Sequence, residues 1–125
     1  MVKLLPKEKV ILHLKEITFV LYWFILMWSY YSNVDLYLTN KRLIFVLFYG
    51  GSRNLPTEIT YYFKKQDLEK YKKSSIESLV LSCEEGKGRF LGDFIKFRIL
   101  KQIDVRVYSN KNKEIKKIVN KYLQS

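Results

Sequence analysis

The chain has 125 residues, of which 48% are hydrophobic, 16% aromatic and 28% charged, and its formal net charge is +11. Such a length and composition predict one globular domain over residues 1–125 and exclude a disordered chain or two ordinary domains. The positive charge favours polyanionic partners: anionic lipid headgroups, nucleic acid or an acidic protein. The single cysteine, Cys83, excludes an internal disulfide. We therefore expect a cytoplasmic protein, with Cys83 as a buried thiol.

Residues 8–23, "EKVILHLKEITFVLYW", begin with an alternation of side chains and then become apolar on both sides, which predicts a long strand. Residues 17–34 carry no charged side chain, so a membrane-spanning helix has to be considered. Only residues 17–28 are strongly apolar, which is too short for a bilayer core of about 30 Å. The favoured interpretation is a strand followed by an aromatic-rich loop or insertion at 24–34, or by a second strand.

Aromatic side chains of this segment are of the types that settle at a bilayer interface, where one edge of the ring stays hydrated. A loop that carries them can dip into a membrane without spanning it. The predicted membrane-contact residues are Trp23, Phe24, Trp28, Tyr30 and Tyr31.

The stretch 35–49, "DLYLTNKRLIFVLFY", is apolar except for a polar group at its centre, Thr39-Asn40-Lys41-Arg42. It predicts a strand at 35–39, a bend at 40–41 and a strand at 42–49, which ends at two glycines. Residues 57–63 form a shorter predicted strand. Residues 64–73 lack a core-facing pattern and predict a basic loop or a single exposed helical turn.

Three further segments, 75–85, 89–100 and 102–109, show the alternation of an antiparallel sheet with one wet face. The turn "EEGKGR" (84–89) joins the first two, and we expect its glycines to supply positive φ. From Asn112, a predicted N-cap, apolar residues recur at helical spacing, which predicts an amphipathic helix at 112–124. The fold class is therefore mainly β: a small antiparallel barrel or sandwich of six or seven strands, capped by one C-terminal helix.

The sequence contains no recognisable set of catalytic residues. His13 is the single histidine, so neither a Ser-His-Asp arrangement nor a histidine-based metal site can form. The run "GKGR" lacks the spacing of a phosphate-binding P-loop. We expect no enzyme activity, no cofactor and no metal.

The run "LYLTNKRLIF" (36–45) resembles the signature of the GRAM and prokaryotic branches of the pleckstrin-homology-like (PH-like) superfold, in which a strand ends in Thr-Asn and resumes with Arg-Leu-Ile-Phe. Glu8-Lys9-Val10, "SSIESLVLS" (74–82) and the terminal helix support the resemblance, which covers about four fifths of the chain. GLUE domains share a similar Leu-Thr-x-x-Arg-Leu sequence at this point. Two departures are Asp35, where the family usually has glycine, and the longer aromatic segment.

The resemblance implies a lipid-binding or protein-binding module, with headgroup sites near the first strand loops. It nominates Lys41, Arg42 and Arg53, with Lys64, Lys65, Lys72 and Lys73 as an auxiliary patch. The alternative is structural: Thr39 and Asn40 satisfy backbone groups at the bend, and Arg42 points toward a carboxylate or carbonyl.

We expect peripheral association with anionic lipids on the cytoplasmic face of a membrane, through a basic surface and an aromatic loop. The alternatives are a protein-interaction or homo-oligomerisation module and, less favoured, single-stranded nucleic-acid binding. The last would stack bases on Tyr37, Tyr61, Tyr62 and Tyr108, although their interleaving with aliphatic residues favours core and cross-strand packing.

Overall fold

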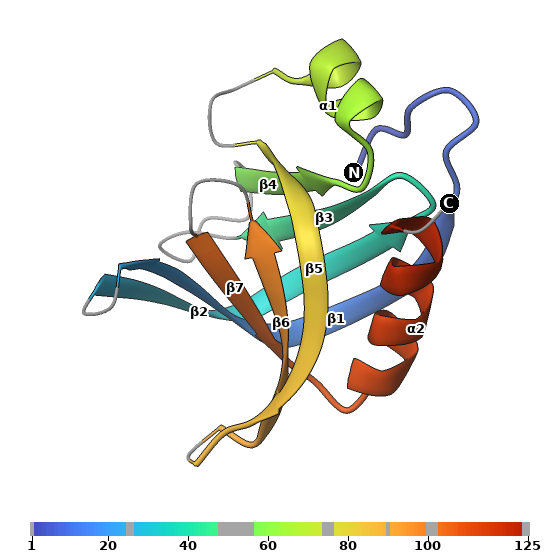
Figure 1. The fold of residues 1–125 in the computed structure, drawn as a ribbon. Coiled ribbons are helices and arrows are strands. Elements are labelled where there is room, and N and C mark those ends of the chain that lie inside the picture. The colour runs from blue at the N-terminus through green and yellow to red at the C-terminus, as the bar shows by residue number, and fades with distance from the viewer. Residues whose placement is uncertain are drawn as a thin grey trace.

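Seven strands close into one barrel in the computed structural model, which describes residues 2–24, 27–47, 57–73, 77–89, 91–99 and 103–123, with the backbone alone at residues 23, 24 and 27. The elements are β1 (Val10–Phe24), β2 (Met27–Thr39), β3 (Arg42–Leu47), β4 (Thr57–Tyr62), α1 (Lys65–Tyr71), β5 (Ser78–Lys87), β6 (Asp93–Ile99), β7 (Ile103–Tyr108) and α2 (Asn112–Leu123) (Figure 1). The predicted mainly β fold with a C-terminal helix is confirmed.

Each strand pairs with its neighbour in the sequence, and β7 returns to β1. All pairs are antiparallel except β4 and β5, which run parallel over two residue pairs, Tyr61 with Ser78 and Tyr62 with Leu79. The barrel is therefore mixed rather than purely antiparallel. The reason is α1, which lies between β4 and β5 in the chain and carries it back before β5 begins, as a parallel connection requires.

Residues 27–34 of the aromatic segment belong to β2, which corrects the prediction of a loop or insertion in favour of the second-strand alternative. β1 and β2 form one long hairpin whose pairing reaches Tyr22 opposite Trp28 and Phe24 opposite Met27. β-Branched and aromatic side chains suit a pleated surface, and here they pair across the two strands.

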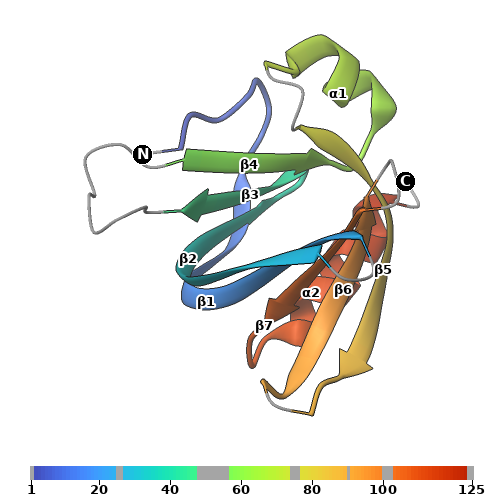
Figure 2. The ribbon, with the colours of Figure 1, turned by 90° about the vertical axis from the view of Figure 1, so that its left-hand side faces the viewer.

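Bulges bend this hairpin near its middle. Glu16 and Asn33 have positive φ, 56° and 55°, where the register between β1 and β2 shifts. On one side of the bend β2 pairs with β3, and on the other side β1 pairs with β7 from Thr18 to Tyr22. The bend therefore carries the hairpin from one wall of the barrel to the other (Figure 2).

Side chains that point inward form one apolar core. Phe19, Leu36, Phe45 and Phe97 are fully buried, and rings of Phe19 and Phe45 lie 4.5 Å apart. α2 covers one side of the barrel against β5 and β6 and contributes two fully buried side chains, Ile115 and Val119. The predicted amphipathic helix therefore caps the barrel.

Two local predictions are wrong in detail. Asn112 is the first residue of α2 rather than its N-cap, and its side chain is buried and donates to the carbonyl of Asp93 at 3.2 Å. Among the described glycines, positive φ occurs at Gly92 (89°) and not at Gly86 or Gly88. At Gly86 and Gly88 the missing side chain makes room for a close neighbour. A Cβ on Gly86 would stand 2.3 Å from the Phe94 ring, and one on Gly88 would stand 2.5 Å from the carbonyl oxygen of Gly92.

Residues 17–24 and 27–34 lie in strands, and neither α1 nor α2, the helices of the described part of the chain, has the length and apolar character needed to span a membrane.

Candidate functional site

The polar group at the bend between β2 and β3 is structural. Thr39 is fully buried, and its hydroxyl accepts hydrogen bonds from the backbone N–H groups of Lys41 and Arg42 at 3.1 and 3.0 Å. Asn40 accepts from the N–H of Lys9 at 2.9 Å and donates to the carbonyl of Lys7 at 3.2 Å. This confirms the backbone role predicted for Thr39 and Asn40.

Arg42, one of the nominated ligand residues, is engaged inside the protein. Its Nε donates to Glu8 Oε2 at 2.9 Å, and its Nη2 donates to Glu8 Oε1 at 3.0 Å and to the carbonyl of Lys3 at 2.7 Å. The arginine side chain is 8% exposed and that of Glu8 is fully buried. Because those donors are already used, the structure corrects the ligand prediction for Arg42 in favour of the structural alternative.

The other nominated lysines lie around α1. Lys41 Nζ is 3.9 Å from Asp67 of α1, and the N–H of Phe63 donates to the carbonyl of Lys41. Lys64 is half-buried next to the start of α1, while Lys65 is exposed and lies 3.9 Å from Glu69. Arg53 lies outside the described residues.

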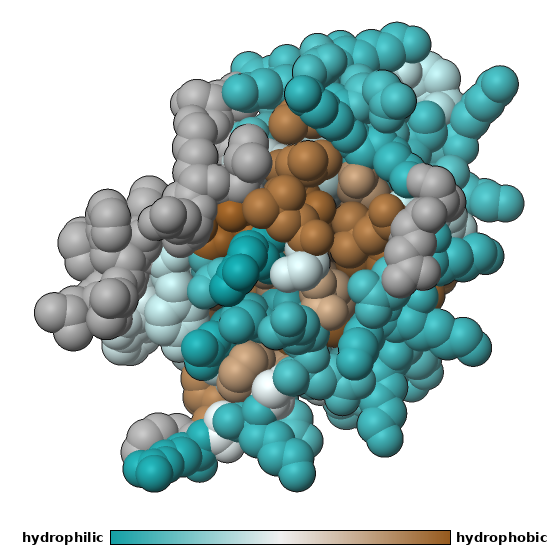
Figure 3. All heavy atoms as spheres, in the orientation of Figure 1, coloured by the Kyte–Doolittle hydropathy of each residue, from teal (hydrophilic) through white to brown (hydrophobic). Residues whose placement is uncertain are grey.

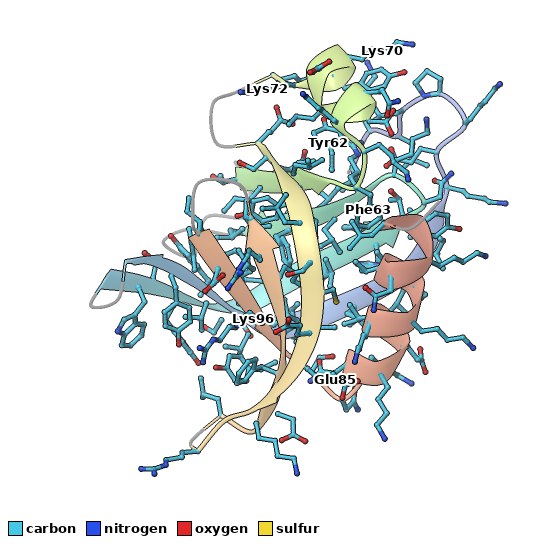
Figure 4. The ribbon with its side chains drawn as sticks, in the orientation of Figure 1. Tyr62, Phe63, Lys70, Lys72, Glu85 and Lys96 are labelled. Atoms are coloured by element: carbon cyan, nitrogen blue, oxygen red, sulfur yellow. The ribbon has the colours of Figure 1, made fainter. Side chains whose placement is uncertain are left out.

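α1 has seven residues, about two helical turns where a basic loop or a single exposed turn was expected, and none of them is buried. Lys72 and Lys73 follow it and are exposed. Figure 4 shows Lys70 and Lys72 at this end of the barrel, away from Lys96 on β6. The lysines of the predicted auxiliary patch thus lie near one another, but carboxylates lie among them. Asp67 pairs with Lys41 and Glu69 pairs with Lys65.

The predicted membrane-contact aromatics divide between two faces of β2. Trp28 is 59% and Tyr30 47% exposed, on the outer face. Tyr31 points the other way and packs on the core, with its ring 5.8 Å from that of Phe19, so its membrane-contact prediction is wrong. Side-chain alternation along a strand is the reason. The side chains of Trp23 and Phe24 lie outside the described part of the structure.

Trp28 and Tyr30 form one wall of a cleft of about 380 Å³ on the outside of the barrel. Tyr22, Arg106 and Tyr108 line its base from β1 and β7, and the connection between β5 and β6 supplies the opposite wall, with Arg89 and the 48%-exposed Leu91. In Figure 1 the β1–β2 and β5–β6 hairpins project from the barrel at the left and the lower left. We call this site the aromatic cleft.

Arg106 is the cation at the base of the aromatic cleft. Its guanidinium carbon lies 4.6 Å from the ring centre of Tyr22 and 4.4 Å from that of Phe94. Burial raises the pKa of the neighbouring Tyr108 phenol, and Arg106 acts against that shift. The phenol therefore stays protonated and neutral at neutral pH, so the cleft combines aromatic surface with the fixed positive charge of Arg106.

The lysines around α1, which we call the α1 lysines, do not form one site with the aromatic cleft. They are Lys41, Lys64, Lys65, Lys72 and Lys73. Trp28 lies near the first residue of β2, and Lys41 follows the last, so the two stand at opposite ends of that strand. The predicted basic surface and the predicted aromatic segment therefore lie at different ends of the barrel.

Sequence reasoning did not single out Arg89, Leu91 or Arg106, and it considered Tyr108 only as a stacking residue. The alternation in "DVRVY" shows that Arg106 faces outward, but it does not show that β7 lies beside β1. The other stacking candidates are unsuited: Tyr61 and Tyr62 are buried, and Tyr37 stacks on His13 with ring centres 4.0 Å apart.

Among the described residues, no group of three or more histidine, cysteine, aspartate or glutamate side chains could hold a metal ion. No protein-family model matches the sequence, and a search of curated proteins finds none similar to it.

Proposed function

We propose that this protein is a non-enzymatic binding module that associates peripherally with anionic membrane surfaces through the aromatic cleft and the two hairpins beside it. The observation that carries the proposal is the joint exposure of Trp28, Tyr30 and Leu91 on neighbouring hairpins. Large exposed apolar side chains that gather at one place mark interaction surfaces, whereas single ones are ordinary.

The side chains match what a bilayer surface requires. Tryptophan and tyrosine favour the headgroup region, and leucine gains from burial in the acyl boundary. Arg89 and Arg106 lie at the same cleft, and each basic residue near an anionic bilayer contributes about 1 kcal/mol. The net charge of +11 adds a long-range attraction to such a surface.

The α1 lysines receive a different role in this proposal from the one their sequence position suggested. With Trp28 at the membrane, Lys41, Lys64, Lys65, Lys72 and Lys73 stand at the far end of the barrel and contribute through the overall field rather than through direct lipid contact.

The test is the partition of the protein onto neutral and anionic lipid vesicles at low and high salt. Trp28→Ser and Leu91→Ser are expected to release the protein from anionic vesicles, because both lose apolar contact. Leu81→Ser is the matched control, since Leu81 is 49% exposed on β5 and does not line the aromatic cleft. Equal partition of Trp28→Ser and Leu81→Ser would contradict the proposal.

A protein-interaction role is the second candidate, and one observation favours it. Figure 3 shows hydrophobic surface between the hydrophilic residues of α1 and those of α2. Leu81 is exposed on β5, and the seam between β4 and β5 holds two residue pairs. If this surface joins two copies, the mass in solution exceeds 15.1 kDa and Leu81→Ser reduces it, whereas Trp28→Ser leaves it unchanged.

The same proposal includes kinship with the PH-like superfold. Seven strands followed by a helix, and a Thr-Asn bend between β2 and β3, support that kinship. An experimental structure with a different strand connectivity would refute it.

A further inference from the structure

Arg106 has an unusual environment for a cation at a protein surface. Its guanidinium lies between the rings of Tyr22 and Phe94, and its Nε is buried without a hydrogen-bond partner. Stacking on two aromatic faces fixes the orientation of the planar group. A buried donor without a partner costs free energy, and the same guanidinium lines the cleft, where its positive charge can attract an anion.

The acids near Arg106 pair with other cations: Asp104, two residues away on β7, lies 3.9 Å from Arg98. The cross-strand partner of Arg106 on β6 is Lys96, a like charge, and its partner on β1 is Val20. The nearest acid to Lys96 that forms an ion pair is Glu84, at 3.9 Å, and none of the ion pairs formed by the described residues includes Arg106. Glu84 therefore offsets Lys96, whereas Arg106 is left as the cation that faces the cleft.

We propose that the aromatic cleft binds the oxyanion head of an anionic amphiphile, with Arg106 holding a phosphate or carboxylate group and with Trp28 and Leu91 holding the apolar chain. This inference rests on the proposed function and names the ligand chemistry of the same site. Tyr108, a neutral phenol beside Arg106, lines the same part of the cleft and adds no competing negative charge.

The size and walls of the cleft favour this class of ligand. A volume of about 380 Å³ accommodates a headgroup and the first part of a chain. Leu91, which is largely exposed, adds aliphatic surface that a bare phosphate would not use. A nucleic-acid strand would need cations spaced along its backbone, whereas Arg106 and Arg89 are the arginines that line this cleft.

The experiment is a titration with octyl phosphate below its micelle concentration. Trp23→Phe leaves Trp28 as the one indole, because the chain has two tryptophans, and its fluorescence reports occupation of the cleft. Inorganic phosphate tests the head alone, and octyl glucoside tests the chain alone. We expect octyl phosphate to bind at least about tenfold more tightly than either, because it uses both the charged and the apolar wall.

Variants locate the charge. Arg106→Gln should reduce octyl phosphate affinity by at least about tenfold, and Arg106→Lys should fall between, since a lysine neither stacks nor forks toward an oxyanion. Lys96→Gln, which changes a neighbouring charge outside the cleft lining, is the control and should keep most of the affinity. Circular dichroism and thermal unfolding establish whether each variant folds. The comparison of octyl phosphate, inorganic phosphate and octyl glucoside on the protein that retains Arg106 tests the proposal even if a variant fails to fold.

The outcomes separate the two proposals. If octyl glucoside or inorganic phosphate binds as tightly as octyl phosphate, the inference is wrong, even where anionic vesicles retain the protein. If octyl phosphate binds through Arg106 but vesicles do not retain the protein, membrane association is wrong and the ligand is a free amphiphile. Loss of vesicle retention in Arg106→Gln, together with lost octyl phosphate binding, identifies the lipid headgroup as the source of the oxyanion.

Discussion

Glu8 and Arg42, which lie 34 positions apart in the chain, form a buried bidentate ion pair that ties the N-terminal segment to the start of β3. Thr39 donates to the same carboxylate at 2.6 Å, and the N–H of Leu5 donates to it at 2.8 Å. Each carboxylate oxygen therefore has two donors. The "TNKR" bend of the sequence is thus a connection between the N-terminal segment and the barrel, not a ligand site.

Glu8→Gln should lower the free energy of unfolding at pH 7 by about 3 to 5 kcal/mol, because it leaves the Arg42 guanidinium buried without its counter-charge. Urea unfolding measures the change. Glu69→Gln is the matched control: Glu69 is an exposed acid in an exposed pair with Lys65, so its loss should cost less than about 1 kcal/mol. Similar losses for the two variants would show that the Glu8 pair adds nothing specific.

The Glu8 pair also predicts how stability depends on pH. Burial alone would raise the pKa of the Glu8 carboxyl, but hydrogen bonds from Arg42, Thr39 and Leu5 outweigh it and lower the pKa below its ordinary value of 4.5. The unfolded chain then binds a proton more readily than the folded protein does, so this stabilisation is complete above that ordinary value. It is lost as the pH falls through the lower pKa of the folded state.

Urea unfolding at pH values from about 2 to about 7 measures this dependence, because that range spans the titration of carboxyl groups. The free energy of unfolding should fall more steeply with acid in the unsubstituted protein than in Glu8→Gln. Parallel curves for the two proteins would mean that Glu8 has the same pKa in the folded and unfolded states.

Gly86→Ala should destabilise the protein by about 1 to 3 kcal/mol, because the new Cβ would overlap the Phe94 ring that lies opposite it on β6. The same ring stacks on Arg106, so octyl phosphate binding should weaken too. Chemical denaturation measures the stability change, with Ser82→Ala on the same strand as the control.

A double variant tests the cause of that change. If the ring is the obstacle, Gly86→Ala combined with Phe94→Leu should cost less than the sum of the two single changes, by about 0.5 kcal/mol or more. Additive costs would indicate that the Phe94 ring is not the obstacle to a side chain at position 86.

Cys83 should react with thiol reagents only after unfolding. Burial raises the pKa of its thiol to about 12, so the reactive thiolate is scarce at neutral pH. We expect the native protein to react with a disulfide reagent at least about a hundredfold more slowly than the protein in urea. An equal rate in both conditions would mean that β5 opens readily, and Cys83→Ser provides the blank.

The sequence by itself determined those features that depend on local periodicity and local chemistry. Alternation predicted the strands, the i, i+3, i+4 spacing predicted α2, and the short polar side chains of Thr39 and Asn40 predicted the bend between β2 and β3. These predictions were right because the backbone period and nearby hydrogen bonds decide them within a few residues.

Only the tertiary structure decided which residues share a surface. It placed Tyr31 against the core while Trp28 faces outward, paired Arg42 with Glu8, and separated the α1 lysines from the aromatic segment. It also brought Arg106 on β7 beside β1, so that an arginine without a signature in the sequence became the centre of the candidate site. The physical reason is that strand partners, register and bulges are set by packing between distant segments, and a pattern within one strand does not specify its neighbour.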